Sequence, residues 1–293
     1  MILIPVSLCG QNKFVPPDPY TSWDGISHKS KYLITSPAFM GPNSLPVPWV
    51  HNARIPEHIS MNGGFEYFKG TGNSTQDFFS QLVIPIADQR VALEFTYTPI
   101  EFYRMDSATS RLWRTYSGSP VTDESMGDFC FGTVIRIVRD HSWLPDLTVS
   151  MNFRTPSGTG RENARHTNTP GYYFDAAIGD EYATGYSFFR SVRWYAEGGF
   201  LVWQTYLDNY PQDDAILFGA GLNLDFRSFF INQTFRGYAG YMNNGDRPLV
   251  YRADLGIKVG TAAFMIGYEK GLKDYPFESI RCGFRIDEVF KHI

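Results

Sequence analysis

Apolar and polar residues alternate along most of the chain beyond residue 59. Residues 147–154, which read LTVSMNFR, place an apolar side chain at every odd position and a polar one at every even position. The same split recurs in residues 91–98, 249–259 and 279–287. Successive side chains of a β-strand point to opposite faces, so this period of two predicts strands with one apolar and one polar face.

Strand length separates a transmembrane barrel from a soluble sandwich. A tilted strand needs about 9 to 11 residues to cross a bilayer, and most of the predicted strands reach that length. About twelve are predicted, an even number as in bacterial barrels. The pattern therefore predicts an all-β fold, a transmembrane antiparallel up-and-down β-barrel. The predicted strands cover residues 58–68, 76–87, 89–104, 127–139, 145–155, 171–179, 190–207, 214–225, 228–241, 247–259, 261–271 and 276–287.

The connections between these strands alternate in length, as in barrels with short periplasmic turns and longer outer loops. Counting from a periplasmic N-terminus, the short links are residues 87–89, 140–144, 225–228 and 259–261, whereas residues 180–189 are long for this rule. Tyrosine and tryptophan also gather at predicted strand ends, as at membrane interfaces. The two longest outer loops are predicted at residues 106–126 and 156–170.

Residues 11–57 contain eight prolines and have no strand periodicity, which predicts an extended, irregular segment. Two roles are open for this segment: a plug inside the barrel, or contact with a periplasmic partner through Trp49, Pro46 and Pro48. Residues 1–10, MILIPVSLCG, resemble the end of a secretory signal peptide. Lipidation of Cys9 is disfavoured because Leu8 stands where an acylation site needs a small residue. The barrel itself is predicted over residues 58–290.

Composition narrows the function classes. The 293 residues include 26 Lys and Arg against 30 Asp and Glu, for a net charge of −4, so the basic field of a nucleic-acid-binding protein is missing. Cys and His residues show no metal-ligand spacing, and no phosphate-binding or cofactor motif is present, so neither a metal nor a cofactor is predicted. No apolar run is long enough for a membrane helix.

The polar strand faces are expected to line the barrel lumen, and their charged residues have both signs. One interpretation is a structural lumen in which opposite charges on neighbouring strands pair. The other is a selectivity surface, in which the arginines of the last strands favour anions. The predicted lumen charges are Glu94, Arg136, Arg154, Asp175, Arg193, Glu197, Arg236, Arg252, Asp254, Lys258, Glu269, Arg281, Arg285 and Asp287.

Catalysis by an outer-membrane barrel needs a reactive group within reach of a lipid headgroup. The cluster whose position suits this is Arg165, His166 and Asn168 in the second long loop. A hydrogen-bonded loop histidine is the ordinary interpretation of His166. The enzyme hypothesis therefore stays second.

Three stretches carry a family resemblance: residues 41–48 (GPNSLPVP), 127–133 (GDFCFGT) and 163–175 (NARHTNTPGYYFD). With them, the chain from about residue 41 onward resembles uncharacterised outer-membrane β-barrel proteins of Bacteroidota. The resemblance implies the outer membrane of a Gram-negative bacterium, and a terminal aromatic residue that acts as an insertion signal. Phe290 is the matching residue, although three more residues follow it.

The sequence thus predicts a non-enzymatic, porin-like barrel, either a small channel or a membrane-embedded subunit of an envelope protein complex. Its expected partners are outer-membrane lipid, lipopolysaccharide and outer-membrane or periplasmic proteins, and nucleic acid is not among them. The alternatives are an outer-membrane lipid-modifying enzyme and a secreted carbohydrate-binding β-sandwich.

Overall fold

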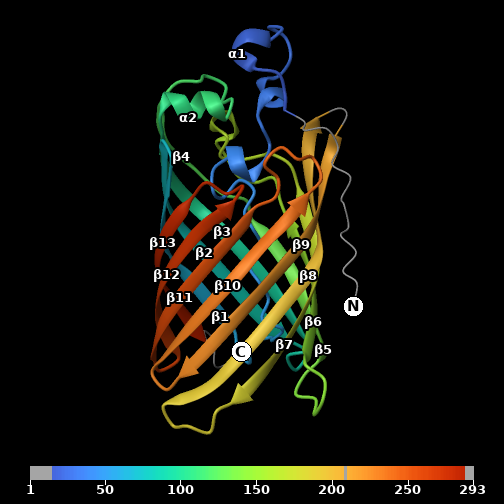
Figure 1. Ribbon diagram of the computed structural model, residues 1–293, viewed down its shortest axis with the longest axis vertical. Helices are drawn as coiled ribbons and strands as arrows, with labels where there is room; N and C mark the ends of the chain where they lie inside the picture. Colours follow the sequence, from blue (N-terminus) through green and yellow to red (C-terminus); the bar gives the residue numbers. More distant parts are fainter. Residues whose placement is uncertain (1–14, 208–209, 288–293) are drawn as a thin grey trace.

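The computed structural model describes residues 15–207 and 210–287, and its strands form a closed antiparallel barrel (Figure 1). Apart from β4 and β5, each strand pairs with its neighbours in sequence, and β1 pairs with both β2 and β13, which closes the barrel. Within the described residues the strands are β1 (Ser60–Gly70), β2 (Asn73–Ile86), β3 (Val91–Met105), β4 (Val121–Ser125), β5 (Cys130–Val138), β6 (Asp146–Arg154), β7 (Gly171–Ala183), β8 (Phe189–Leu207), β9 (Tyr210–Phe226), β10 (Phe229–Gly240), β11 (Leu249–Val259), β12 (Ala262–Lys273) and β13 (Glu278–Asp287).

The barrel wall has twelve strand positions in the described part of the chain, because β4 and β5 share one of them. Both pair with β3, β4 near its end and β5 near its beginning. The side chain of Asp128, which lies between β4 and β5, accepts hydrogen bonds from the backbone N–H groups of Ser157 and Gly158 at 2.9 and 2.8 Å. Asp128 thus ties down the next loop, and the strand pairing is interrupted at this point. The predicted twelve-stranded barrel is confirmed, and a β-sandwich of two sheets is wrong.

The predicted loop over residues 106–126 is only partly correct. It contains the helix α2 (Ser107–Leu112) as well as β4. Asp106 caps α2 by accepting a hydrogen bond from the Thr109 backbone N–H at 2.8 Å, and this bond lowers the pKa of Asp106. The long link expected at residues 180–189 is also shorter, because β7 continues to Ala183 and β8 begins at Phe189.

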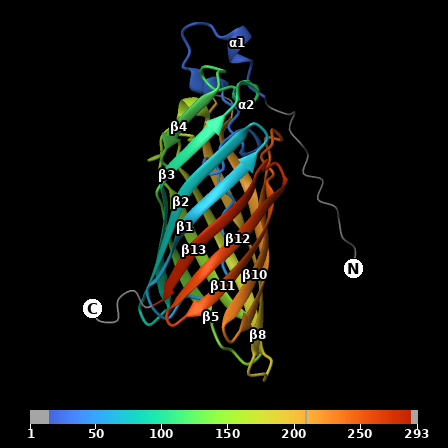
Figure 2. The ribbon, with the colours of Figure 1, turned by 90° about the vertical axis from the view of Figure 1, so that its left-hand side faces the viewer.

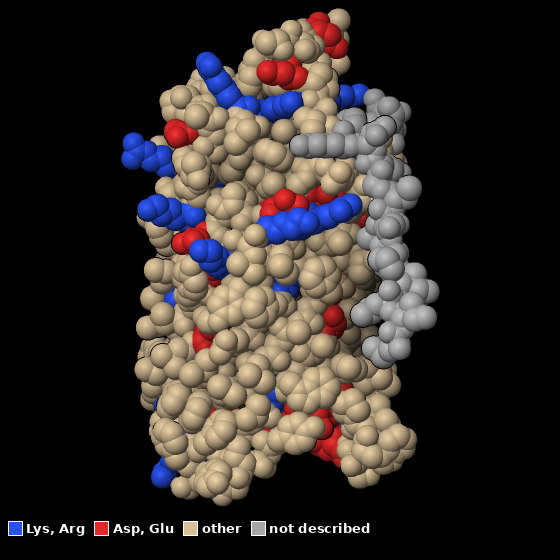
Figure 3. Space-filling model, in the orientation of Figure 1, with Lys and Arg blue, Asp and Glu red and all other residues tan. Residues whose placement is uncertain are grey.

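The outer wall is apolar and the interior is polar. Outward side chains such as Phe264, Ile266 and Ile280 are exposed, whereas inward neighbours such as Arg281 are buried. On the face drawn in Figure 3, charged side chains gather towards the end that carries α1, and few appear on the lower wall. In a β-barrel that spans the outer membrane, apolar side chains face the lipid and polar side chains face the lumen, as they do here. In the described residues no helix is long and apolar enough to span a membrane.

The two ends of the barrel differ. One end carries short turns, namely residues 87–90, 139–145, 184–188, 227–228 and 260–261. The opposite end carries the long connections 106–120, 155–170 and 241–248, and α1 (Pro19–Ser22) lies above it (Figures 1 and 2). By the usual loop asymmetry of bacterial barrels, the long-loop end faces outwards and the short-turn end faces the periplasm.

The chain before β1 enters the barrel from the outer end. Residues 15–39, here called the cap, contain α1, η1 (Lys29–Tyr32) and η2 (Pro37–Phe39). The hydroxyl of Tyr20 donates to the Thr115 carbonyl at 2.5 Å, which joins the cap to the loop after α2. Residues 40–58, here called the lumen segment, then run inside the barrel to the start of β1 at the short-turn end.

Candidate functional site: the occupied lumen

The lumen segment lies inside the barrel and contacts strands on all sides of it. Near the outer end the Asn43 amide donates to Asp77 at 2.6 Å and Glu101 at 2.7 Å. Near the periplasmic end the Arg54 guanidinium donates to Asp146 at 3.2 Å. These partners lie on β2, β3 and β6. Because the two groups of contacts lie at opposite ends of the barrel, the segment crosses the full length of the lumen.

Prolines explain why this segment needs no strand partner. Pro42, Pro46 and Pro48 carry no backbone N–H, so they leave fewer donors to satisfy away from water. All three line a cavity of about 160 Å³ on the outer side of Trp49. Trp49 separates this outer cavity from a larger vestibule of about 660 Å³ towards the periplasmic end, and it contacts both.

The outer half of the lumen contains an apolar cluster beside its charged side chains, and the strand pattern did not predict this cluster. Met40, Leu45 and Val47 of the lumen segment are 0%, 3% and 4% exposed. They pack in one cluster with large inward side chains of the wall, among them Trp203 and Tyr238. Burial of this apolar surface stabilises the segment in place.

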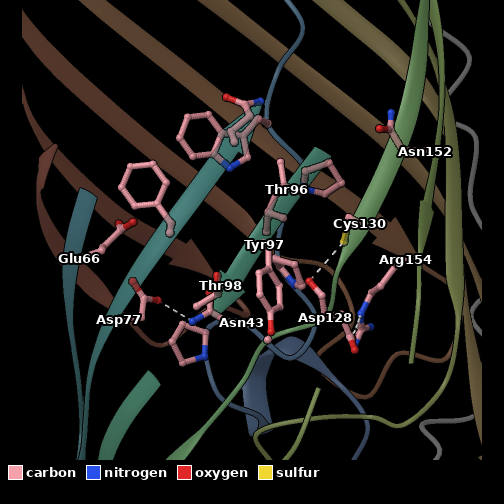
Figure 4. A pocket seen from close by; sticks show the side chains of 18 of the residues that line it. Asn43, Glu66, Asp77, Thr96, Tyr97, Thr98, Asp128, Cys130, Asn152 and Arg154 are labelled. Atoms are coloured by element: carbon pink, nitrogen blue, oxygen red, sulfur yellow. Dashed lines mark hydrogen bonds and ion pairs between the residues drawn. The ribbon is translucent and has the colours of Figure 1, made fainter. Parts of the chain in front are cut away.

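Charged side chains around the outer cavity make polar contacts, two of which are drawn in Figure 4. Asp77 accepts from Asn43, and Arg154 forms an ion pair with Asp128. The carboxylates Glu66, Asp77 and Glu101 were missed in the sequence analysis. The signal was available, since Glu66 stands between Phe65 and Tyr67 and Glu101 between Ile100 and Phe102, which is the strand alternation itself.

Three arginines of the last strands surround Trp49. The guanidinium carbons of Arg252 and Arg281 lie 4.4 and 4.7 Å from the centre of its ring. That of Arg236, on β10, lies 5.5 Å away. A cation over the face of a tryptophan ring is attracted by the π-electrons of the ring. The three arginines therefore hold the indole from β10, β11 and β13.

The same arginines also pair with carboxylates. Arg252 lies 3.2 Å from Glu269 and 3.3 Å from Asp254, Arg281 lies 2.7 Å from Asp254, and Arg236 pairs with Glu269. The lumen charges around Trp49 therefore form ion pairs with one another. In a buried network of this kind, each charge offsets part of the desolvation cost of its partner.

His51 forms a second polar centre. Its Nε2 lies 3.0 Å from Glu94 Oε2, and its Nδ1 lies 3.1 Å from Asp175 Oδ1 and 3.8 Å from Glu197 Oε2. Its backbone N–H donates to Glu197 at 2.7 Å. The lumen segment is therefore bound to β3, β7 and β8 at one residue.

The remaining predicted lumen charges lie nearer the periplasmic end. Arg193 donates to the Asn52 carbonyl at 2.8 Å and pairs with Asp146 at 2.9 Å. Arg136 donates to the carbonyl of Asp88 in the β2–β3 turn, and Lys258 pairs with Asp225 beside the β9–β10 turn. Arg285 and Asp287, which lie 3.2 Å apart, line the vestibule.

The loop cluster predicted as a surface site is not open to the surface. Arg165 and His166 are each 2% exposed. Arg165 donates to Glu101 at 2.6 Å, and His166 Nδ1 lies 3.2 Å from Asp128 Oδ1. Asn168 is exposed, with a left-handed backbone at φ 55°. The loop folds back into the barrel mouth, so an exposed Arg165–His166–Asn168 site is wrong.

The guanidinium group of Arg165, which pairs with Glu101, also packs against the lumen segment at Gly41. A Cβ at Gly41 would lie 2.4 Å from the guanidinium carbon of Arg165, so only glycine allows this approach. Phe290, the predicted insertion signal, lies outside the described residues, as do residues 1–10 and Cys9.

A search with models of known protein families found no match, and neither did a search of curated protein sequences. Solved structures do match. An outer-membrane channel from Pseudomonas putida F1 is 10% identical with a TM-score of 0.49, over 82% of this chain and 99% of that one. The transport unit of the autotransporter AIDA-I from Escherichia coli is 10% identical with a TM-score of 0.47, over 85% and 95%.

A third match is the KdgM porin in complex with oligogalacturonate, at 10% identity and a TM-score of 0.43, over 78% of this chain and 98% of that one. These likenesses concern the fold. The polar interior, the apolar wall and the loop asymmetry independently make this chain an outer-membrane β-barrel protein. Its membership of a Bacteroidota family stays a prediction.

Proposed function

We propose that the protein is a small outer-membrane channel that is held closed by its own N-terminal segment. The observation that carries this proposal is the course of the lumen segment, which crosses the interior of the barrel and is fixed to it at Asn43, Trp49, His51 and Arg54. In this state the segment fills the path of a solute.

The vestibule supports a transport role. It is lined by charged side chains of both signs, including Arg193, Asp254 and Arg285. A polar space of about 660 Å³ is large enough to receive a small solute from the periplasmic side, and it ends at Trp49. Movement of the lumen segment would connect it with the outer cavity.

Conductance in a planar bilayer tests the proposal. The wild-type protein should be silent or open rarely. Triple replacement of Trp49, His51 and Arg54 by Ala removes three of the four anchors of the segment and leaves every strand unchanged, so the open probability should rise at least tenfold. Trp23→Ala, in the cap, is the control and should stay silent.

A chain lacking residues 15–57 gives the decisive comparison. If it inserts as a folded barrel and still conducts no current, the closed-channel proposal is wrong.

The cap favours a second candidate, a membrane-embedded subunit of an envelope protein complex. Trp23 is 43% exposed and Ile26 is 91% exposed, so the cap presents apolar side chains at the outer end. A photo-crosslinking residue at position 26 should then capture one defined partner in intact cells. The same residue at position 186, in a turn at the other end, should not capture that partner.

A further inference from the structure

His51 and the three carboxylates around it form a group whose charge does not balance. Glu94, Asp175 and Glu197 are 9%, 5% and 7% exposed. Among the described residues, His51 is the one basic side chain within ion-pair distance of these three carboxylates. Even a protonated imidazole supplies one positive charge against three negative ones, and buried carboxylates without a counter-charge are costly.

One carboxylate also has an unused oxygen. The Glu197 side chain is 1% exposed, and its Oε1 has no hydrogen-bond partner. Its Oε2 accepts from the His51 backbone N–H and faces the imidazole at 3.8 Å. A bound cation would satisfy this buried oxygen and supply positive charge that the cluster lacks.

We infer that His51, Asp175 and Glu197 form a binding site for a divalent transition-metal ion such as Zn²⁺. Their ligand atoms, His51 Nδ1 and one oxygen of each carboxylate, all lie within 4.8 Å of one another. Ligands of a tetrahedral zinc ion, with bonds of 2.0 to 2.1 Å, are about 3.3 Å apart. The measured separations of 3.1 and 3.8 Å from Nδ1 bracket this value.

Residues around the cluster orient the ligands as second-sphere groups do in zinc sites. Glu94 Oε2 lies 3.0 Å from His51 Nε2, so an Nε2–H donated to Glu94 leaves Nδ1 free to bind the ion. Gln81 donates to the other Glu94 oxygen, and the hydroxyl of Ser150 donates to Asp175. The imidazole ligand favours a transition metal over Ca²⁺ or Mg²⁺, which prefer oxygen ligands alone.

The ion has a route to the site and a consequence once bound. His51 and Glu94 line both the outer cavity and the vestibule, so the cluster is reached from the periplasmic side. The ligands come from the lumen segment, β7 and β8. A bound ion would therefore clasp the segment to the wall, which deepens the closed-channel proposal and rests on it only for this consequence.

The binding test uses the full-length protein in detergent, titrated calorimetrically with Zn²⁺. The wild type should bind one ion per chain, and Asp175→Asn and Glu197→Gln should each raise the Kd at least tenfold. Asp146→Asn, a buried carboxylate that pairs with Arg54 and Arg193, is the matched control and should bind as the wild type does. Heat-modifiable migration on gels identifies the folded protein.

A spectroscopic measurement on the wild type needs no variant. Co²⁺ at this site should give the intense visible absorption of a four-coordinate ion, and Zn²⁺ should displace it. Lack of saturable binding, equal binding by Glu197→Gln and the wild type, or the weak spectrum of octahedral Co²⁺ would each overturn the metal site. None of these measurements involves conductance, so the metal-site proposal can be wrong while the closed-channel proposal stands, and the reverse.

Discussion

At the residue scale, Trp49 shows how one side chain organises many charges. Three guanidinium groups converge on its indole from β10, β11 and β13, and each also pairs with a carboxylate. Without the ring, these like charges would face one another and the cavities on either side. Trp49 therefore both blocks the lumen and spaces the arginines.

Replacing Trp49 with Ala should lower the free energy of unfolding in urea by about 2 kcal/mol, the range of a desolvated cation–π contact. Trp23→Ala is the control, because the Trp23 ring has a single lysine, Lys29, at 4.8 Å and is 43% exposed. Its effect should be less than half as large. Equal effects of the two changes would show that the arginines draw no stability from Trp49.

At the element scale, the lumen segment behaves as an unpaired extended strand that is held by side chains. Its backbone is poor in donors because of Pro42, Pro46 and Pro48, so it needs no ladder of hydrogen bonds. It comes close to the wall where the wall has no side chain. A Cβ at Gly219, on β9, would lie 2.7 Å from Val50 Cγ2.

This close approach allows the segment to be fastened to the wall. Val50→Cys with Gly219→Cys should form a disulfide, because the two Cβ positions are near enough for one. Cys130 and Cys282, both free thiols, and Cys9 are replaced by Ser to prevent other pairings. Mass spectrometry should find the linked peptides without added reductant, and the link should abolish the conductance gained when Trp49, His51 and Arg54 are replaced by Ala. Two free thiols after oxidation would place the segment elsewhere.

At the scale of the whole molecule, the cap lies at the end with the long loops, while β1 begins and β13 ends at the end with short turns. The chain therefore enters the lumen from outside and leaves it towards the periplasm. This orientation has a direct test in the two exposed residues Ile26, in the cap, and Tyr186, in the β7–β8 turn.

In a background without Cys9, Cys130 and Cys282, Ile26→Cys should react with a membrane-impermeant maleimide on intact cells. Tyr186→Cys should react only after the outer membrane is permeabilised. Labelling of Tyr186→Cys alone on intact cells would reverse the orientation, and with it the assignment of the vestibule to the periplasm.

The sequence by itself determined the barrel wall. Alternation with a period of two assigns each strand residue to a face, so the inward position of Arg252 or Asp254 follows without any distant partner. The short turns at residues 87–90, 227–228 and 260–261 likewise follow from local residues. Glu66 and Glu101 were within reach of the same reasoning.

Only the tertiary structure decided what meets inside the barrel. Glu94, Asp175 and Glu197 come from three strands, and His51 joins them from a segment with no periodic pattern. Their contact depends on strand register, on closure of the barrel and on the course of the lumen segment, which are long-range properties without a local signature. The same reason explains why Arg165 and His166, in a polar loop, are buried in the barrel mouth.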